Sequence, residues 1–150
     1  MSNWLARLKG MKCEAVDAIE YEEGPADIGD IYSVGTSIQF TGGFRLEAQF
    51  WRLTKGGPLV SIFDHRHRYG LPEPIDAFRV MHDELVGKEV LDAVMDKTTG
   101  DLRIRFDGDV DLEVFNFTAF EIWAVTFPDG TGELSNYALS KTETVEFRPG

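Results

Sequence analysis

Hydrophobic and charged residues alternate along the stretch from Leu102 to Val114, which is the pattern of half-buried β-strands. The alternation is interrupted by the three-residue segment Asp107-Gly108-Asp109. A loop of this length keeps the apolar residues of both strands on one face. The pattern therefore predicts a β-hairpin in which Ile104 lies opposite Leu112.

The polar face of this predicted hairpin carries opposite charges in matched places. Its register sets Arg105 opposite Asp111 and Arg103 opposite Glu113. Such cross-strand pairs contribute roughly 0.2 to 1 kcal/mol each. In the loop, Gly108 is expected to adopt a positive φ, because glycine has no Cβ to clash there.

An earlier stretch, 38–48, repeats the pattern of 104–114, with Ile38 matching Ile104 and so on through both segments. Each stretch leads to a tryptophan, Trp51 or Trp123, and then to a glycine turn. Upstream, Leu8-Lys9-Gly10 corresponds to Leu85-Val86-Gly87 at the end of a predicted helix. The repeated order of helix, strand, hairpin and tryptophan strand predicts an internal duplication.

Helices are predicted from Ser2 to about Lys9 and from Ala77 to about Leu85, the second capped by Asp76. Further strands are expected at 11–19, near 31–34, at 90–94, 133–139 and 144–147, and at 59–63, which should be largely buried. The expected fold class is α+β, mainly β: antiparallel sheets from an internally duplicated helix–strand–hairpin–Trp-strand unit, with two short helices. We expect a single domain, 1–150, with repeats at about 2–70 and 75–140.

The composition fits a folded chain. With 150 residues, 43% of them hydrophobic, the chain can bury a core without disulfide staples. No apolar run approaches the ~20 residues of a membrane span, and the N-terminus lacks the order of a signal peptide. We therefore expect a cytoplasmic protein with no membrane partner. The single cysteine, Cys13, lies in a predicted strand and is interpreted as a small buried residue.

The formal net charge is −11, which makes nucleic acid an unexpected partner because phosphate binding needs clustered Lys and Arg. Residues 1–75 carry 10 acidic against 8 basic side chains, whereas 76–150 carry 16 against 7, with no Lys or Arg from 106 to 140. One interpretation is solubility. The other is an acidic face for a basic protein partner, with the candidate residues Asp107, Asp109, Glu121, Asp129 and Glu133.

Common catalytic and cofactor motifs are absent from the sequence, which contains no GxSxG, phosphate loop, GxGxxG, HExxH or CxxC. We therefore expect no cofactor, no catalytic residues and a protein that is not an enzyme, unless distant positions assemble a site. His65 and His67 are the best metal candidates, because an HxH pair in an extended segment points to one side. The interleaved Arg66 and Arg68 disfavour a bound cation, so no metal is expected.

The tryptophans Trp51 and Trp123 have two interpretations. Their matching places favour packing in the core or between the repeats. The alternative is a small-molecule pocket at the junction of the repeats, formed by Trp51, Arg52, His65 and Trp123.

Several segments occur in an order that resembles a loose group of small uncharacterised bacterial cytoplasmic proteins: Phe50-Trp51-Arg52, Asp64, Leu85-Val86-Gly87-Lys88, Thr99 to Phe106, and Phe120-Glu121-Ile122-Trp123. Some members of such groups look like immunity proteins encoded beside polymorphic or contact-dependent toxins. The resemblance covers most of the chain and implies a domain type more than an activity.

These observations favour a non-catalytic binding protein, an immunity-type antidote whose acidic second half blocks a basic toxin. The alternatives are a small-molecule binding or catalytic domain with a pocket between the repeats, and a homo-oligomeric structural module. The sequence leaves the oligomeric state open.

Overall fold

The computed structural model describes residues 4–21, 33–62, 68–116, 122–136 and 141–146. Within these ranges the chain is mainly β, with two short α-helices and strands that pair in antiparallel fashion. The elements are α1 (Trp4–Leu8), β1 (Cys13–Tyr21), β2 (Ser33–Phe40), the 3₁₀ turn η2 (Thr41–Gly43), β3 (Arg45–Ala48), β4 (Trp51–Lys55), β5 (Leu59–Ile62), α2 (Ala77–Leu85), β6 (Val90–Met95), β7 (Leu102–Phe106), β8 (Val110–Val114), β9 (Trp123–Thr126), β10 (Thr131–Asn136) and β11 (Lys141–Glu146).

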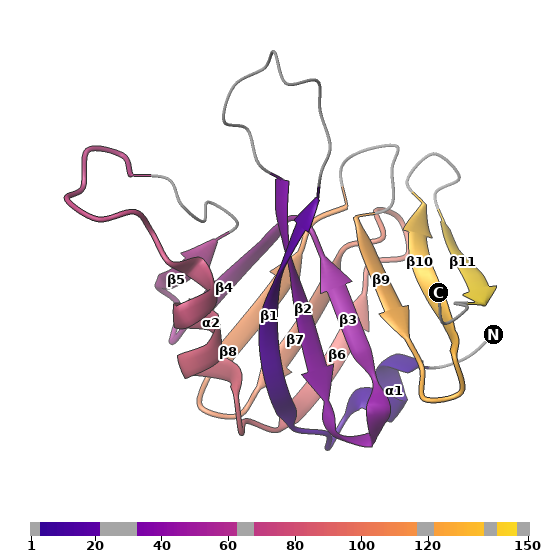
Figure 1. Ribbon diagram of the computed structural model, residues 1–150. Coiled ribbons are helices and arrows are strands. Elements are labelled where there is room, and N and C mark those ends of the chain that lie inside the picture. The colour runs from indigo at the N-terminus through magenta and orange to yellow at the C-terminus, as the bar shows by residue number, and fades with distance from the viewer. Residues whose placement is uncertain (1–3, 22–32, 63–67, 117–121, 137–140, 147–150) are drawn as a thin grey trace, which may run out of the picture.

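The strands form two sheets. The first sheet has six strands in the order β1-β2-β3-β9-β10-β11, and the second has five in the order β5-β4-β8-β7-β6. In Figure 1 the first sheet stands in front of the second. Apolar residues from both sheets and both helices form one core. In this core, the rings of Phe40 and Phe106 stack across the two sheets with centroids 6.3 Å apart.

Both predicted hairpins are present in the expected register. In β7 and β8, Ile104 lies opposite Leu112, and their apolar faces are buried while the charged residues face outward. In β2 and β3, Ile38 lies opposite Leu46. Gly108 has φ +80°, as expected, and the following Asp109 also has a positive φ of +62°.

The strand after each hairpin joins the opposite sheet. β4, which follows the first hairpin, pairs with β8 of the second, so that Trp51 lies opposite Val114. β9, which follows the second hairpin, pairs with β3 of the first, so that Trp123 lies opposite Ala48. Each sheet is therefore built from both halves of the chain.

The residue after each helix also bonds to the strand that follows the other helix. The N–H of Gly10, after α1, donates to the carbonyl of Val90 over 2.8 Å, and the N–H of Gly87, after α2, donates to the carbonyl of Cys13 over 2.8 Å. The register of β1 shifts between Cys13 and Ala15, and that of β6 shifts between Val90 and Asp92. Helix α1 thus leads into β1, which begins beside the residue that follows α2. Helix α2 leads into β6, which begins beside the residues that follow α1.

Two predicted strands differ from the structure, and the predicted start of one helix lies outside the described residues. β2 is one strand of eight residues, not a short strand near 31–34 followed by a separate hairpin arm. β5 is an edge strand with Leu59 54% exposed, so the prediction of a largely buried strand was wrong there. α1 is described from Trp4, since Ser2 lies outside the described residues.

Helix α2 begins as predicted, because the carboxylate of Asp76 accepts a hydrogen bond from the N–H of Arg79 over 3.1 Å. Neither helix has the length and apolar character that a membrane crossing requires in the described part of the chain.

Candidate functional site

The loop between β7 and β8 presents two of the predicted acidic residues to solvent. Asp107 and Asp109 are both exposed, and Gly108 lies between them. The carbonyl of Asp109 accepts a hydrogen bond from the N–H of Gly56 over 2.9 Å, which ties this loop to the β4–β5 turn. Within the described residues, neither carboxylate forms an ion pair. The ammonium group of Lys88 lies next to the loop, 2.9 Å from the position that a Cβ on Gly108 would occupy.

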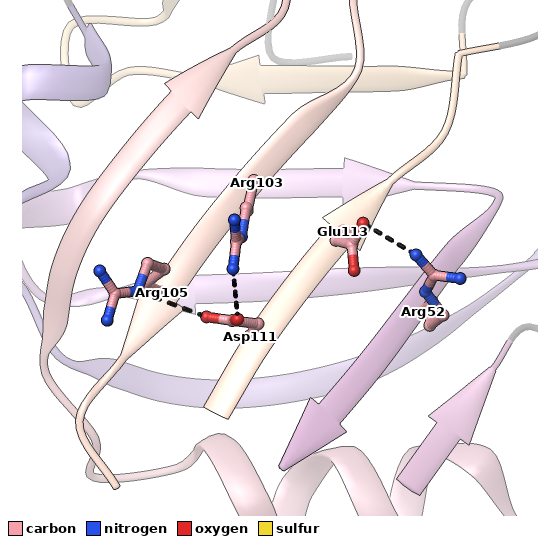
Figure 2. Close-up of polar contacts among 5 residues, drawn as sticks. All are labelled: Arg52, Arg103, Arg105, Asp111 and Glu113. Carbon is pink, nitrogen blue, oxygen red and sulfur yellow. Dashed lines mark hydrogen bonds and ion pairs between the residues drawn. The ribbon is translucent and has the colours of Figure 1, made fainter. Parts of the chain in front are cut away.

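The outer face of the second sheet carries the remaining charges of the hairpin. Figure 2 shows that Arg103 bonds to Asp111 over 2.8 Å, and that Arg105 approaches the same carboxylate at 3.7 Å. Glu113 bonds to Arg52 of β4 over 3.0 Å. The predicted register is confirmed, but Arg103 pairs diagonally with Asp111 instead of with Glu113. The reason is that Arg52 stands opposite Glu113 on its other side.

This network reduces the acidic character that the sequence indicates. The stretch without Lys or Arg from 106 to 140 is not free of positive charge in space, because arginines from β4 and β7 cover Asp111 and Glu113. The hydrogen bond that Arg103 donates to Asp111 raises the pKa of Arg103 further above its already high ordinary value. All of these groups are partly exposed, so each pair contributes about 1 kcal/mol or less.

Asp129 lies in the turn between β9 and β10, where its side chain organises the backbone. Its carboxylate accepts hydrogen bonds from the hydroxyl of Thr131 over 2.6 Å and from the N–H of Thr131 over 3.0 Å. These bonds, the hydroxyl one first, lower the pKa of Asp129 below its ordinary value. The carboxylate stays ionised at neutral pH and remains fully exposed.

We expect Thr131→Val to move the pKa of Asp129 back toward its ordinary value, because the variant loses the stronger of the two hydrogen bonds. A carboxyl-carbon NMR titration measures this directly. A folded pKa below the unfolded one means that the contribution of Asp129 to stability is present above the unfolded pKa and is lost as pH falls through the folded pKa. An unchanged Asp129 titration in Thr131→Val would contradict this assignment, and Thr126→Val serves as the matched control.

The other two predicted acidic residues do not join this surface in the described structure. Glu133 in β10 is 7% exposed and lies opposite the buried Val125, so its side chain belongs to the edge of the core. Glu121 lies outside the described residues. The exposed members of the predicted set in the described structure are therefore Asp107 and Asp109 in the β7–β8 loop and Asp129 in the β9–β10 turn. Both of these connections lie at the lower end of Figure 1.

The tryptophans of the alternative pocket are buried in different sheets. Trp51 is fully buried in β4 and packs against Phe78 of α2 with ring centroids 5.7 Å apart. Trp123 is 1% exposed in β9 and packs in the same way against Trp4 of α1. Arg52 is exposed on the outer face of its sheet, and His65 lies outside the described residues. The structure does not bring Trp51, Arg52 and Trp123 together around one hollow.

Trp123 also forms a structural hydrogen bond that the sequence did not predict. Its indole N–H donates to the carbonyl of Gly100 over 2.8 Å. The same turn is held by Asn116, whose side-chain amide donates to the carbonyl of Thr99 over 2.9 Å and whose N–H donates to Asp101 over 2.7 Å. These contacts attach the β6–β7 turn of the second sheet to a strand of the first. We refer to Trp123, Thr99, Gly100, Asp101 and Asn116 as the turn latch.

The remaining candidates for chemistry are a thiol and the histidines. Burial raises the pKa of the Cys13 thiol to about 11, which fits a structural residue and not a nucleophile. No three metal-ligating side chains come together in the described ranges, and His65 and His67 are outside them. His82 is exposed on α2, with Asp83 at 3.5 Å.

The sequence did not reveal a broad, open groove of about 750 Å³ on the outer face of the first sheet. Its floor is formed by outward-facing residues of β2, β3 and β9, and Glu14 of β1 contributes to its lining. Phe127 and Pro128 line it from the turn after β9. On the floor, Arg45 forms an ion pair with Glu47. The groove thus combines two carboxylates, one guanidinium and apolar surface.

Comparisons with known proteins found no matching family model, no matching curated protein and no matching solved structure.

Proposed function

We propose that this chain is a non-catalytic protein-binding domain that binds a basic protein partner, and that it acts as an immunity-type antidote in the cytoplasm by blocking a basic toxin. The observation that carries the proposal is the set of exposed carboxylates in two loops at one end of the molecule. Asp107, Asp109 and Asp129 are exposed. Within the described residues, none of the three forms an ion pair, in contrast to Asp111 and Glu113.

Electrostatics supports this proposal further. A chain with a net charge of −11 attracts a basic partner over a distance, which speeds association and makes it sensitive to salt. An antidote benefits from fast association because it must bind before the toxin acts. The proposal assigns no catalytic step to the chain.

We also infer that the two halves arose by internal duplication. The matched registers support this: Trp51 opposite Val114 corresponds to Trp123 opposite Ala48. The reciprocal bonds of Gly10 and Gly87 and the paired register shifts of β1 and β6 support it as well. Equivalent positions of the two sheets can then be compared directly.

Reversing the charges of Asp107, Asp109 and Asp129 to lysine is the test of the proposed function. We expect the association rate with the toxin encoded beside this chain to fall by about tenfold or more at low salt, and the difference to shrink as salt is raised. Stopped-flow fluorescence measures both effects.

The matched control reverses three exposed acids elsewhere, Glu73, Asp83 and Asp92, and so changes the net charge equally. We expect a smaller effect from it, because none of the altered charges belongs to the two loops. Equal effects of the two triple variants would show that only the net charge of the chain matters, and that the position of the charges in the loops does not. An unchanged rate in the loop variant would contradict the proposed function.

A further inference from the structure

Next to Glu47 on the first sheet, small residues occupy the places that arginines occupy next to Glu113 on the second sheet, and one of them, Ala124, lines the groove. Glu113 of β8 lies opposite Arg52 of β4, and Glu47 of β3 lies opposite Ala124 of β9 in the equivalent register. On its other side, Glu113 lies opposite Arg103, whereas Glu47 lies opposite Ser37. The outer face of the second sheet is covered by its own guanidinium groups, whereas the groove of the first sheet lies on the Ala124 side of Glu47, and Ser37 on the other side is buried.

The second sheet shows how an arginine sits on this type of surface. The Arg52 guanidinium donates to a carboxylate oxygen of Glu113 over 3.0 Å and lies over the ring of Phe115 at 5.0 Å. The two glutamates are equally accessible, since the side chains of Glu47 and Glu113 are both 29% exposed. Ala124 offers no side chain that reaches Glu47.

We propose that the groove binds an arginine side chain of the protein partner, seated over Ala124 and paired with Glu47 as Arg52 is paired with Glu113. This inference rests on the proposed function, and it adds a defined contact to the surface of acidic loops. Arg45 bonds to Oε1 of Glu47, and within the described structure no second side chain pairs with this carboxylate. Oε2 can therefore accept a hydrogen bond from an incoming guanidinium.

The charge and shape of the groove fit an extended basic segment. Among the lining residues Glu14 and Glu47 outnumber Arg45, and the guanidinium of Arg7 lies over the ring of Phe44, another lining residue, at 4.9 Å. Exposed Pro128 offers apolar surface for the aliphatic stem of a long side chain. The groove is open along the sheet, whereas small-molecule sites enclose most of their ligand. Arginine is favoured over lysine because its planar fork matches a carboxylate.

The probe is a short extended peptide, acetyl-Gly-Arg-Val-Arg-Gly-amide, titrated into the ¹⁵N-labelled chain. We expect amide shift changes at Glu47, Ala124 and Thr126, and weaker changes with the same peptide carrying lysine in place of arginine. Ala124→Arg fills the groove with the chain's own guanidinium and should weaken peptide binding by about tenfold. A position equivalent to Ala124 already carries Arg52 in the second sheet, so the fold is expected to tolerate the change.

Two further variants make the test specific. Val94→Arg adds the same charge on an exposed strand of the second sheet, 48% exposed, and should leave the shift changes at Glu47 in place. Glu47→Gln removes the carboxylate without filling the groove and should also weaken binding. Shift changes that are absent from the groove, or equally strong in Ala124→Arg and the original chain, would overturn the inference.

The same variants separate this inference from the proposed function. If the toxin binds and the loop charge reversals weaken it, but Ala124→Arg has no more effect than Val94→Arg, the groove assignment fails and the proposed function stands. If the peptide binds in the groove but charge reversal of the loops leaves toxin association unchanged, the proposed function fails in its acidic-loop form. Peptide shift changes confined to residues 107–109 would also overturn the groove assignment.

Discussion

Replacing Trp123 with alanine is expected to lower the free energy of unfolding by about 3 to 5 kcal/mol, the range typical of deleting a large buried aromatic side chain. Trp123 is 1% exposed and packs against Trp4, with ring centroids 5.7 Å apart. The variant also removes the hydrogen bond to Gly100 and so releases one contact of the turn latch. Urea denaturation followed by circular dichroism measures the loss.

A matched pair of phenylalanine variants separates packing from the hydrogen bond. Trp123→Phe and Trp4→Phe each shrink a buried ring, but the indole N–H of Trp4 donates no hydrogen bond within the described part of the chain. We expect Trp123→Phe to cost about 1 kcal/mol more, because the carbonyl of Gly100 loses its donor. Equal losses in the two variants would show that this bond contributes nothing to stability.

Gly100→Ala is expected to destabilise the chain by about 2 to 4 kcal/mol. Gly100 has φ +81°, a conformation that costs an L-residue about 1 to 2 kcal/mol. A Cβ at this position would also lie 2.7 Å from the side-chain nitrogen of Asn116. Asn116 is 4% exposed and cannot move without breaking its hydrogen bond to Thr99, which adds the cost of an unsatisfied buried group.

Gly87→Ala is the control for this prediction. Gly87 has a similar φ of +85°, but a Cβ there would meet no atom within 4 Å. The loss of stability in Gly87→Ala should therefore be about 1 to 2 kcal/mol, which is the cost of the backbone conformation alone. If chemical denaturation gave the same loss for both variants, the close approach of Gly100 to Asn116 would have no energetic effect.

Local pattern was enough to predict the hairpins. In β7 and β8 the alternation of apolar and charged residues, together with the length of the loop, determined which residues lie opposite each other, as Ile104 and Leu112 do. The cap of α2 was also readable, because Asp76 precedes a helical stripe. These features depend on residues that are close in the sequence, so the local pattern of residue types is enough to predict them.

The exchange of strands could not be read in the same way. Pairing of β4 with β8 and of β9 with β3 joins residues far apart in the chain, and alternation within a strand does not specify which sheet it joins. The burial of Glu133 was missed for a similar reason, because it depends on β10 lying beside Val125. A long-range neighbour decides the environment of both.

The candidate site was predicted only in part. Three of the predicted acidic residues, Asp107, Asp109 and Asp129, are exposed in the described structure. The groove was missed, although one signal was present: the residue after each matched tryptophan is Arg52 in one half and Ala124 in the other. Its meaning depended on knowing that both residues point outward, opposite a glutamate.

Because the first half of the chain supplies β4 and β5 to the second sheet, and the second half supplies β9, β10 and β11 to the first sheet, the two halves are interlocked. A fragment that ended after β5 would lack the neighbour of β3, and the complementary fragment would lack the neighbour of β8. Neither fragment could complete the backbone hydrogen bonds of its strands alone. Loss of one half therefore leaves β3 or β8 with one unpaired edge. Such a chain unfolds as one cooperative unit, and its folding waits for contacts that close long loops.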